Sequence, residues 1–189
     1  MTVAHSVELI LGGQRSGKSR CAEERARAWL QQPGHEAVLV ATAQAHDAEM
    51  RERIARHRAD RAARAPGLST EEVPDELPAS LRRLGAPHRL VVVDCLTLWL
   101  TNLLMPMHGS ALDERAWDAQ RQSLCEALDA SQGPVVLVSN EIGLGLSPMS
   151  PEARRFVDAL GHLHQAVARC ASRVTLMVAG LEVNVKGPA

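Results

Sequence analysis

Tyrosine is absent from this sequence, and its aromatic residues amount to one phenylalanine and three tryptophans. A surface that stacks nucleic-acid bases needs several aromatic rings, so this composition argues against one. No C-x-x-C pair occurs among Cys21, Cys95, Cys125 and Cys170, which argues against a zinc ribbon or a thioredoxin-type site. We interpret the four cysteines as reduced, mostly buried thiols of a cytosolic protein.

Long apolar runs are also lacking. No stretch approaches the length of a membrane span, and the amino terminus has no basic region typical of a signal peptide. Lys plus Arg number 21 and Asp plus Glu 22, a net charge of -1, which argues against a nucleic-acid coat or a polybasic membrane binder. We expect a cytoplasmic protein with no nucleic-acid partner. Its 189 residues, 46% of them apolar, predict one domain spanning residues 1–189.

Short β-branched runs alternate with helical stretches along the chain. The runs occupy residues 7–11, 38–41, 90–93, 135–138 and 174–178. Near-continuous apolar runs of this kind are typical of parallel strands covered on both faces. The clearest helix carries an apolar stripe at steps of three and four, formed by Phe156, Leu160, Leu163, Val167 and Cys170.

This alternation predicts a doubly wound α/β fold, a mostly parallel sheet flanked by helices. Residues 65–78 hold three prolines and four acids, and we predict a surface connection there.

The strongest motif is a glycine-rich loop that matches G-x-x-x-x-G-K-[ST] at every fixed position. It reads Gly12, Gly13, Gln14, Arg15, Ser16, Gly17, Lys18 and Ser19. A strand precedes it and a helical stretch follows, so its backbone N–H groups and the helix amino terminus can wrap a polyphosphate. We expect Lys18 on the β- and γ-phosphates and Ser19 as a ligand of Mg²⁺.

An acidic residue at the end of a neighbouring strand would help to hold that metal through its water shell. Asp94 follows the apolar run Leu90–Val93 and is the first candidate; the alternative is an aspartate that caps the next helix. Asn140 and Glu141 end another strand and are the second candidates. All of these residues would lie at the carboxyl edge of the sheet, where ligands bind in open α/β folds.

Sequence features outside the loop narrow the class of P-loop protein. No N-K-x-D motif for a guanine base is present, and the D-x-x-G match at Asp158 falls inside the apolar-striped helix. A DNA-dependent motor would be longer. The residues therefore indicate phosphoryl or nucleotidyl transfer to a small molecule.

Residues 47–64 form an arginine-rich helical stretch with His57 one turn from both Arg53 and Arg61. Nearby guanidinium groups lower the pKa of an imidazole, and a neutral imidazole can attack phosphorus. From these residues alone, a half-buried structural histidine on a solvated helix is the favoured interpretation. We interpret the other histidines as structural, with His46 as the alternative nucleophile.

Further motifs along almost the whole chain favour a catalytic role of His57 over a structural one. They are the P-loop, Ala41–Gln44, Glu49 and Met50 with Arg53, Ile54 and His57, Asp94–Thr97, Thr101–Leu104, Ser139–Gly145, and Arg154, Phe156, Asp158, Gly161 and Gln165. With these motifs the sequence resembles the bifunctional adenosylcobinamide kinase/adenosylcobinamide-phosphate guanylyltransferase family of cobalamin biosynthesis. The patterns E-M-x-x-R-I-x-x-H and S-N-E-x-G-x-G are the most specific part of the resemblance.

The resemblance implies two reactions on a P-loop fold like the RecA core. Adenosylcobinamide is phosphorylated with ATP or GTP, and GMP from GTP then passes to the adenosylcobinamide phosphate through a guanylylated histidine, which maps onto His57. It also implies a homo-oligomer, a trimer. The alternatives are a monofunctional P-loop kinase and a non-catalytic nucleotide-binding switch.

The resemblance also implies which residues contact the nucleotide. They are the P-loop residues, Thr42, Ala43, Gln44, Arg58, Ala59, Asp60, Arg61, Glu72 and Asp94. A small insertion after the histidine helix leaves Glu71 as an alternative to Glu72. The chain departs from the usual family pattern at residues 147–149, which read Ser-Pro-Met, and at His164, which replaces a common asparagine.

Overall fold

The computed structural model describes residues 6–44 and 48–188, apart from the side chains of residues 48–50, 53, 54, 57 and 60. One sheet of seven strands, ordered β3-β2-β4-β5-β1-β6-β7, forms its centre. Six strands are parallel and the last is antiparallel to β6. The strands are β1 (Val7–Gly12), β2 (Glu36–Ala41), β3 (Leu68–Glu72), β4 (Arg89–Asp94), β5 (Val135–Asn140), β6 (Arg173–Val178) and β7 (Leu181–Lys186).

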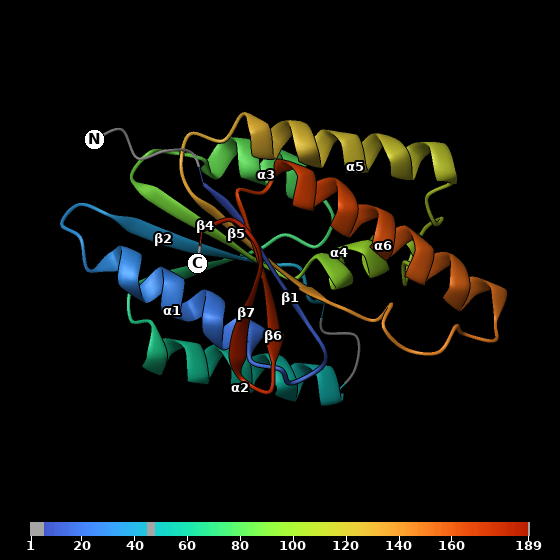
Figure 1. Cartoon of the computed structure of the whole chain (residues 1–189), viewed down its shortest axis with the longest axis horizontal. Helices are drawn as coiled ribbons and strands as arrows, with labels where there is room; N and C mark the ends of the chain where they lie inside the picture. The colour runs from blue at the N-terminus through green and yellow to red at the C-terminus, as the bar shows by residue number, and fades with distance from the viewer. Residues whose placement is uncertain (1–5, 45–47, 189) are drawn as a thin grey trace.

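Helices cover both faces of this sheet (Figure 1). They are α1 (Lys18–Leu30), α2 (Ala48–Arg64), α3 (Leu77–Leu84), α4 (Leu96–Leu104), α5 (Glu114–Asp129) and α6 (Pro151–Cys170). The first two lie on one side of the sheet and the other four on the opposite side. Within the described residues, no helix is long and apolar enough to cross a membrane. The expected flanked, mostly parallel sheet is confirmed.

Central strands are apolar on both faces because both faces are covered. In β4, Val91 and Val93 belong to the core under α3–α6, while Leu90 and Val92 belong to the core under α1. This explains the near-continuous apolar run in the sequence. The predicted stripe of α6 is also confirmed, since Leu160, Leu163 and Val167 are buried.

Two edge strands and one helix depart from the sequence expectations. Residues 65–78, predicted as a surface connection, contain β3 and the start of α3. β3 pairs with β2 alone, and most of its side chains are exposed, so a polar sequence is compatible with a strand there. β7 was not predicted either, since every one of its residues is exposed and no continuous apolar run marks it.

Candidate active site

The P-loop joins β1 to α1, and its path requires glycine at two positions. Gly12 has φ 154°, and a Cβ there would lie 2.6 Å from both the carbonyl oxygen of Met177 and Oγ of Ser16. Gly17 has φ 102° in the left-handed region and lies against Gly180. The loop is tied to the end of β6 by a hydrogen bond from the Gly180 amide to the Ser16 carbonyl, at 3.0 Å.

Lys18 reaches back across this loop from the first turn of α1. Its Nζ donates to the Gly13 carbonyl at 2.6 Å, and the residue is only 7% exposed. Burial lowers the pKa of this ammonium group, while the nearby Asp94 carboxylate acts in the opposite direction. Asp94 ends β4 as predicted, so the structure brings together the cation and the acidic strand end that the sequence singled out.

Thr42 has a different orientation from that expected of a nucleotide contact. Its side chain is fully buried, and its hydroxyl donates to the Cys95 carbonyl at 2.7 Å and accepts from the Cys95 amide at 2.9 Å. The hydroxyl therefore fastens the end of β2 to the start of α4. Burial raises the pKa of the Cys95 thiol to about 12, so this cysteine is an uncharged packing group at neutral pH.

Asn102 of α4 joins two strand ends and was not predicted as a site residue. Its Nδ2 donates to the carbonyl of Thr42 at 2.8 Å and to the carbonyl of Pro74 at 3.0 Å. The side chain thus holds together the segments that follow β2 and β3. A lone amide in the apolar helix Leu96–Leu104 was the signal available in the sequence, because a buried amide needs partners.

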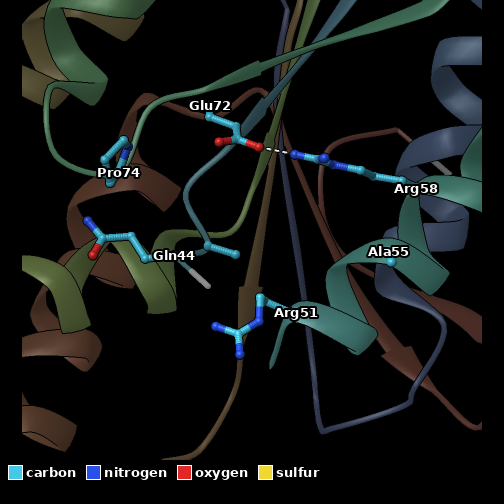
Figure 2. A pocket seen from close by; sticks show the side chains of 7 residues that line it. Gln44, Arg51, Ala55, Arg58, Glu72 and Pro74 are labelled. Carbon is cyan, nitrogen blue, oxygen red and sulfur yellow. Dashed lines mark hydrogen bonds and ion pairs between the residues drawn. The ribbon is translucent and has the colours of Figure 1, made fainter. Parts of the chain in front are cut away.

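A cavity of about 390 Å³ lies between these strand ends and α2. It is lined by Ala43, Gln44, Arg51, Ala55, Arg58, Glu72 and Pro74 (Figure 2). Arg58 of α2 forms an ion pair with Glu72 across the cavity, whereas Glu71 pairs with Arg83 of α3. Of the two glutamates, Glu72 is the one that lines this cavity.

The other residues of α2 that were predicted to contact the nucleotide do not line this cavity in the described part of the chain. Arg61 is buried and donates to the Thr70 hydroxyl at 3.4 Å, so it packs on β3 and does not line the cavity, while Ala59 is exposed. His57 and Asp60 lie in the helix, but their side chains lie outside the described part, as does all of His46. Arg51 lines the cavity, yet nothing in the sequence distinguishes it from the other arginines of α2.

The end of β5 carries a chain of hydrogen bonds beside the P-loop. The Asn140 amide donates to Oγ1 of Thr97 at 2.8 Å, which lies 3.0 Å from Oγ of Ser139. That oxygen is 2.8 Å from Nε2 of buried His164, and Nδ1 of the same ring is 3.5 Å from the Glu141 carboxylate. Burial lowers the pKa of His164, with Glu141 opposing the shift.

One assignment of protons satisfies every member of this chain. With a neutral ring protonated at Nδ1, Thr97 donates to Ser139, Ser139 donates to Nε2, and Nδ1 points its proton at Glu141. His164 thus bonds to two groups of the protein itself, Ser139 and Glu141. It fixes the strand end at which Asn140 pairs with Gly12.

The donor set for a metal consists of few protein groups. Among the described residues, no group of three or more His, Cys, Asp or Glu side chains is arranged to hold a metal ion. Ser19 and Asp94 are both half-buried at the P-loop and supply a hydroxyl and a carboxylate. Oxygen donors of this kind fit Mg²⁺, which keeps several waters and takes further ligands from substrate phosphates.

Comparison with known proteins now identifies the family. A family model described as cobinamide kinase / cobinamide phosphate guanyltransferase matches residues 8–185. The chain belongs to this family. It is 48% identical over 180 residues to a bifunctional adenosylcobalamin biosynthesis protein, CobP, of Pseudomonas aeruginosa, covering 95% of this chain and 97% of that protein. It is 36% identical over 187 residues to the bifunctional protein CobU of Escherichia coli, covering 94% and 98%.

Solved structures support the same fold at low sequence identity. A KaiC-like protein of Pyrococcus horikoshii superposes with a TM-score of 0.52 and 14% identity, covering 91% of this chain and 70% of that one. At this identity the likeness concerns the fold alone. It confirms the P-loop fold of the RecA type that the resemblance implied.

Proposed function

We propose that this cobinamide kinase/guanyltransferase family member carries out both reactions on one domain, with the P-loop shared between them. The observation that carries the proposal is the match of the family model to residues 8–185, combined with a P-loop whose Lys18 lies within electrostatic reach of Asp94. Its substrates would be adenosylcobinamide, its phosphate, GTP and ATP.

In the first reaction, the aminopropanol hydroxyl of adenosylcobinamide attacks the γ-phosphorus of the nucleoside triphosphate. A phosphorus–oxygen bond forms, the bond to the bridging oxygen breaks, the nucleoside diphosphate leaves, and the hydroxyl proton passes to water. The P-loop amides and Lys18 stabilise negative charge on the phosphate oxygens. Asn140 and Glu141 stand at the adjoining strand end, since the Glu141 amide donates to the Gly12 carbonyl at 2.9 Å.

In the second reaction, a ring nitrogen of His57 attacks the α-phosphorus of GTP and pyrophosphate leaves. An oxygen of adenosylcobinamide phosphate then attacks the same phosphorus, the nitrogen–phosphorus bond breaks, and adenosylcobinamide-GDP is released. The helix that carries His57 also lines the cavity between Gln44 and Glu72. Guanine carries N–H groups, and a carboxylate such as that of Glu72 accepts hydrogen bonds from N–H groups. This complementarity supports placing the guanine base in the cavity.

Mg²⁺ would supply charge neutralisation at the transferring phosphates when bound. Ser19 and Asp94 would hold it, the hydroxyl directly and the carboxylate through water. The free thiols of the four cysteines support a cytoplasmic location of the enzyme. The proposed enzyme is a homotrimer, as the family resemblance implies.

Labelling with GTP that carries ³²P at the α-phosphate tests the histidine. We expect an acid-labile, alkali-stable protein adduct. His57→Ala should abolish the adduct and retain transfer of the γ-phosphate to adenosylcobinamide, while Lys18→Ala should reduce both by at least about 100-fold. His162→Ala, an exposed histidine on α6, serves as the control. Equal labelling of His57→Ala would reduce the proposal to a monofunctional kinase.

A further inference from the structure

Large apolar side chains are exposed at three places in the described part of the chain: the connection after α4, the segment between β5 and α6, and the β6–β7 hairpin. The β5–α6 segment is the most exposed, with Leu144 at 83%, Leu146 at 99% and Met149 at 95%. Contiguous exposed apolar groups of this kind mark interaction sites more often than scattered single ones do.

The base of this segment is fixed beside the P-loop. The Glu141 amide donates to the Gly12 carbonyl, and the Glu141 carboxylate accepts from the Gly143 amide at 2.6 Å and faces His164. The exposed leucines therefore begin only a few residues from the loop that would hold the transferring phosphates.

The far end of the segment is fixed on α6. Nη1 of Arg154 donates to the carbonyls of Pro148 and Met149, at 3.0 and 2.7 Å, and Ser150 caps the helix. Figure 1 shows the segment running outward from the end of β5 to the amino-terminal end of α6. With both ends fixed, the leucines are presented on a short arch at the carboxyl edge of the sheet.

A cavity of about 330 Å³ lies under this arch. Apolar groups of Ile142, Leu146, Pro148 and Val157 line it, and Asp158 adds an exposed carboxylate. Ser147 and Arg154 also line the cavity, so apolar and polar groups are mixed in its wall, a combination that can orient a small molecule. It lies on the α6 side of the sheet, whereas the cavity of Arg58 and Glu72 lies against α2.

We propose that residues 142–149 and the cavity beneath them bind the corrin ring of the cobinamide substrate. The proposal rests on the function proposed above. The reacting hydroxyl sits on a short arm of that substrate, so the ring must lie close to the P-loop when the hydroxyl meets the γ-phosphate. A corrin ring has broad apolar faces, which match the leucines and Met149. Its amide side chains carry N–H donors, which match the carboxylate of Asp158.

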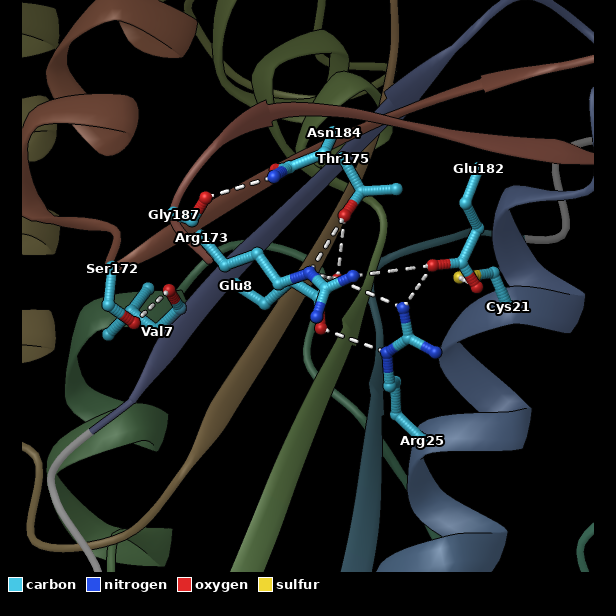
Figure 3. Close-up of polar contacts among 10 residues, drawn as sticks. All are labelled: Val7, Glu8, Cys21, Arg25, Ser172, Arg173, Thr175, Glu182, Asn184 and Gly187. Atoms are coloured by element: carbon cyan, nitrogen blue, oxygen red, sulfur yellow. Dashed lines mark hydrogen bonds and ion pairs between the residues drawn. The ribbon is translucent and has the colours of Figure 1, made fainter. Parts of the chain in front are cut away.

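The apolar stripe on β7 offers a matched control of the same residue types. Leu181 and Val183 are exposed there, on the strand that an ion network of Glu8, Arg25, Arg173 and Glu182 fastens to α1 (Figure 3). This stripe lies on the antiparallel edge strand, two strands from β1, whereas residues 142–149 follow β5 on the other side of β1.

The test compares Leu144→Ser/Leu146→Ser with Leu181→Ser/Val183→Ser in the full chain. For each protein, three quantities are measured: the Michaelis constant for adenosylcobinamide in the kinase reaction, the labelling of the protein by GTP alone, and the mass by light scattering. We expect the first variant to raise the Michaelis constant for adenosylcobinamide by about tenfold or more. Its labelling by GTP and its mass should match those of the wild type, and the control should match the wild type in all three quantities.

Three results would overturn the inference, and they can be told apart. An unchanged Michaelis constant in the first variant places the ring elsewhere, while the proposed function stands. A changed mass in that variant assigns the arch to an interface between copies of this chain. A wild-type protein that labels with GTP and does not turn over adenosylcobinamide contradicts the proposed function itself, and the corrin site with it.

Discussion

The P-loop and the ends of β2 and β3 lie at the same edge of the sheet, but they are held in different ways. The P-loop is shaped by its own backbone, through the conformations of Gly12 and Gly17 and its bond to Gly180. The ends of β2 and β3 are shaped by a side chain from elsewhere, since Asn102 of α4 joins the segments that follow them. The first region should be broken by adding one methyl group, and the second by removing one amide.

The largest effect is expected from Gly12→Ala. A Cβ at this position would lie 2.6 Å from a backbone carbonyl, and the backbone φ of 154° disfavours any other residue. The variant should lose about 3 kcal/mol of unfolding free energy and, because the loop must shift, most of its activity in both reactions. Urea unfolding measures the first quantity and GTP labelling reports on the second.

Gly13→Ala is the matched control for that prediction, because nothing lies within 4 Å of a Cβ added there. Its unfolding free energy should stay within about 0.5 kcal/mol of the wild type. Equal stability of the two variants would show that the P-loop does not depend on the close approach at Gly12.

Asn102→Ala should have the next largest effect and breaks the second region. The carbonyls of Thr42 and Pro74 lose their donor in a buried setting, which should lower the unfolding free energy by about 2–3 kcal/mol. Gln44 and Glu72 line the cavity and lie within two residues of Thr42 and Pro74. Because the same strand ends carry them, the Michaelis constant for GTP should rise as well. Thr101→Ala is the control: it removes one bond within α4, to the Thr97 carbonyl, on a half-buried side chain. An equal change in the Michaelis constant for GTP in both variants would count against a role for Asn102 in shaping the cavity.

This contrast also explains how much of the molecule could be predicted from its sequence. The P-loop, the five buried strands, α2 and α6 follow from local patterns of glycine and apolar residues. The strands β3 and β7 do not, because each pairs on one side only and needs no continuous apolar run. The site divides in the same way. Asp94 beside Lys18 follows from strand ends meeting at one edge, whereas Arg61 turning to Thr70 depends on tertiary packing that no spacing encodes.

The end of β5 lies between the two regions, and there His164 links Ser139 to Glu141. Two substitutions of this histidine separate its two contacts. In His164→Asn the side-chain amide can lie where Nδ1 lies and keep a donor for Glu141, while in His164→Gln it can reach the place of Nε2 and keep the contact with Ser139. We expect a loss of about 1 kcal/mol for each substitution. If the Nδ1 proton holds Glu141, His164→Gln should also reduce the kinase activity more than His164→Asn.

The pH dependence of stability checks the same histidine. Burial lowers the folded-state pKa of His164 below 6.5, so the unfolded chain binds a proton more readily there. Stability should fall as the pH drops from about 6.5 through the folded-state pKa, by at most about 1.4 kcal/mol per pH unit. Urea unfolding between about pH 7.5 and 5 should show a smaller loss in His164→Asn. Parallel curves for the two proteins would mean that other groups carry the proton uptake.

The smallest effect is expected at the β7 edge, in the ion pair between Glu182 and Arg25 of α1. Hydrogen bonding to Arg25 lowers the pKa of Glu182, so this carboxylate stabilises the fold at neutral pH and the contribution is lost as the pH falls through its folded-state pKa. Its side chain is about a third exposed, so solvent screens the pair, and Glu182→Gln should lower the unfolding free energy by at most about 1 kcal/mol. Glu24→Gln, in the exposed pair with Arg20, should change it by less than about 0.5 kcal/mol. A larger loss in Glu182→Gln, accompanied by reduced GTP labelling, would mean that the hairpin supports the P-loop through Gly180 and that the two ends of the sheet are not independent.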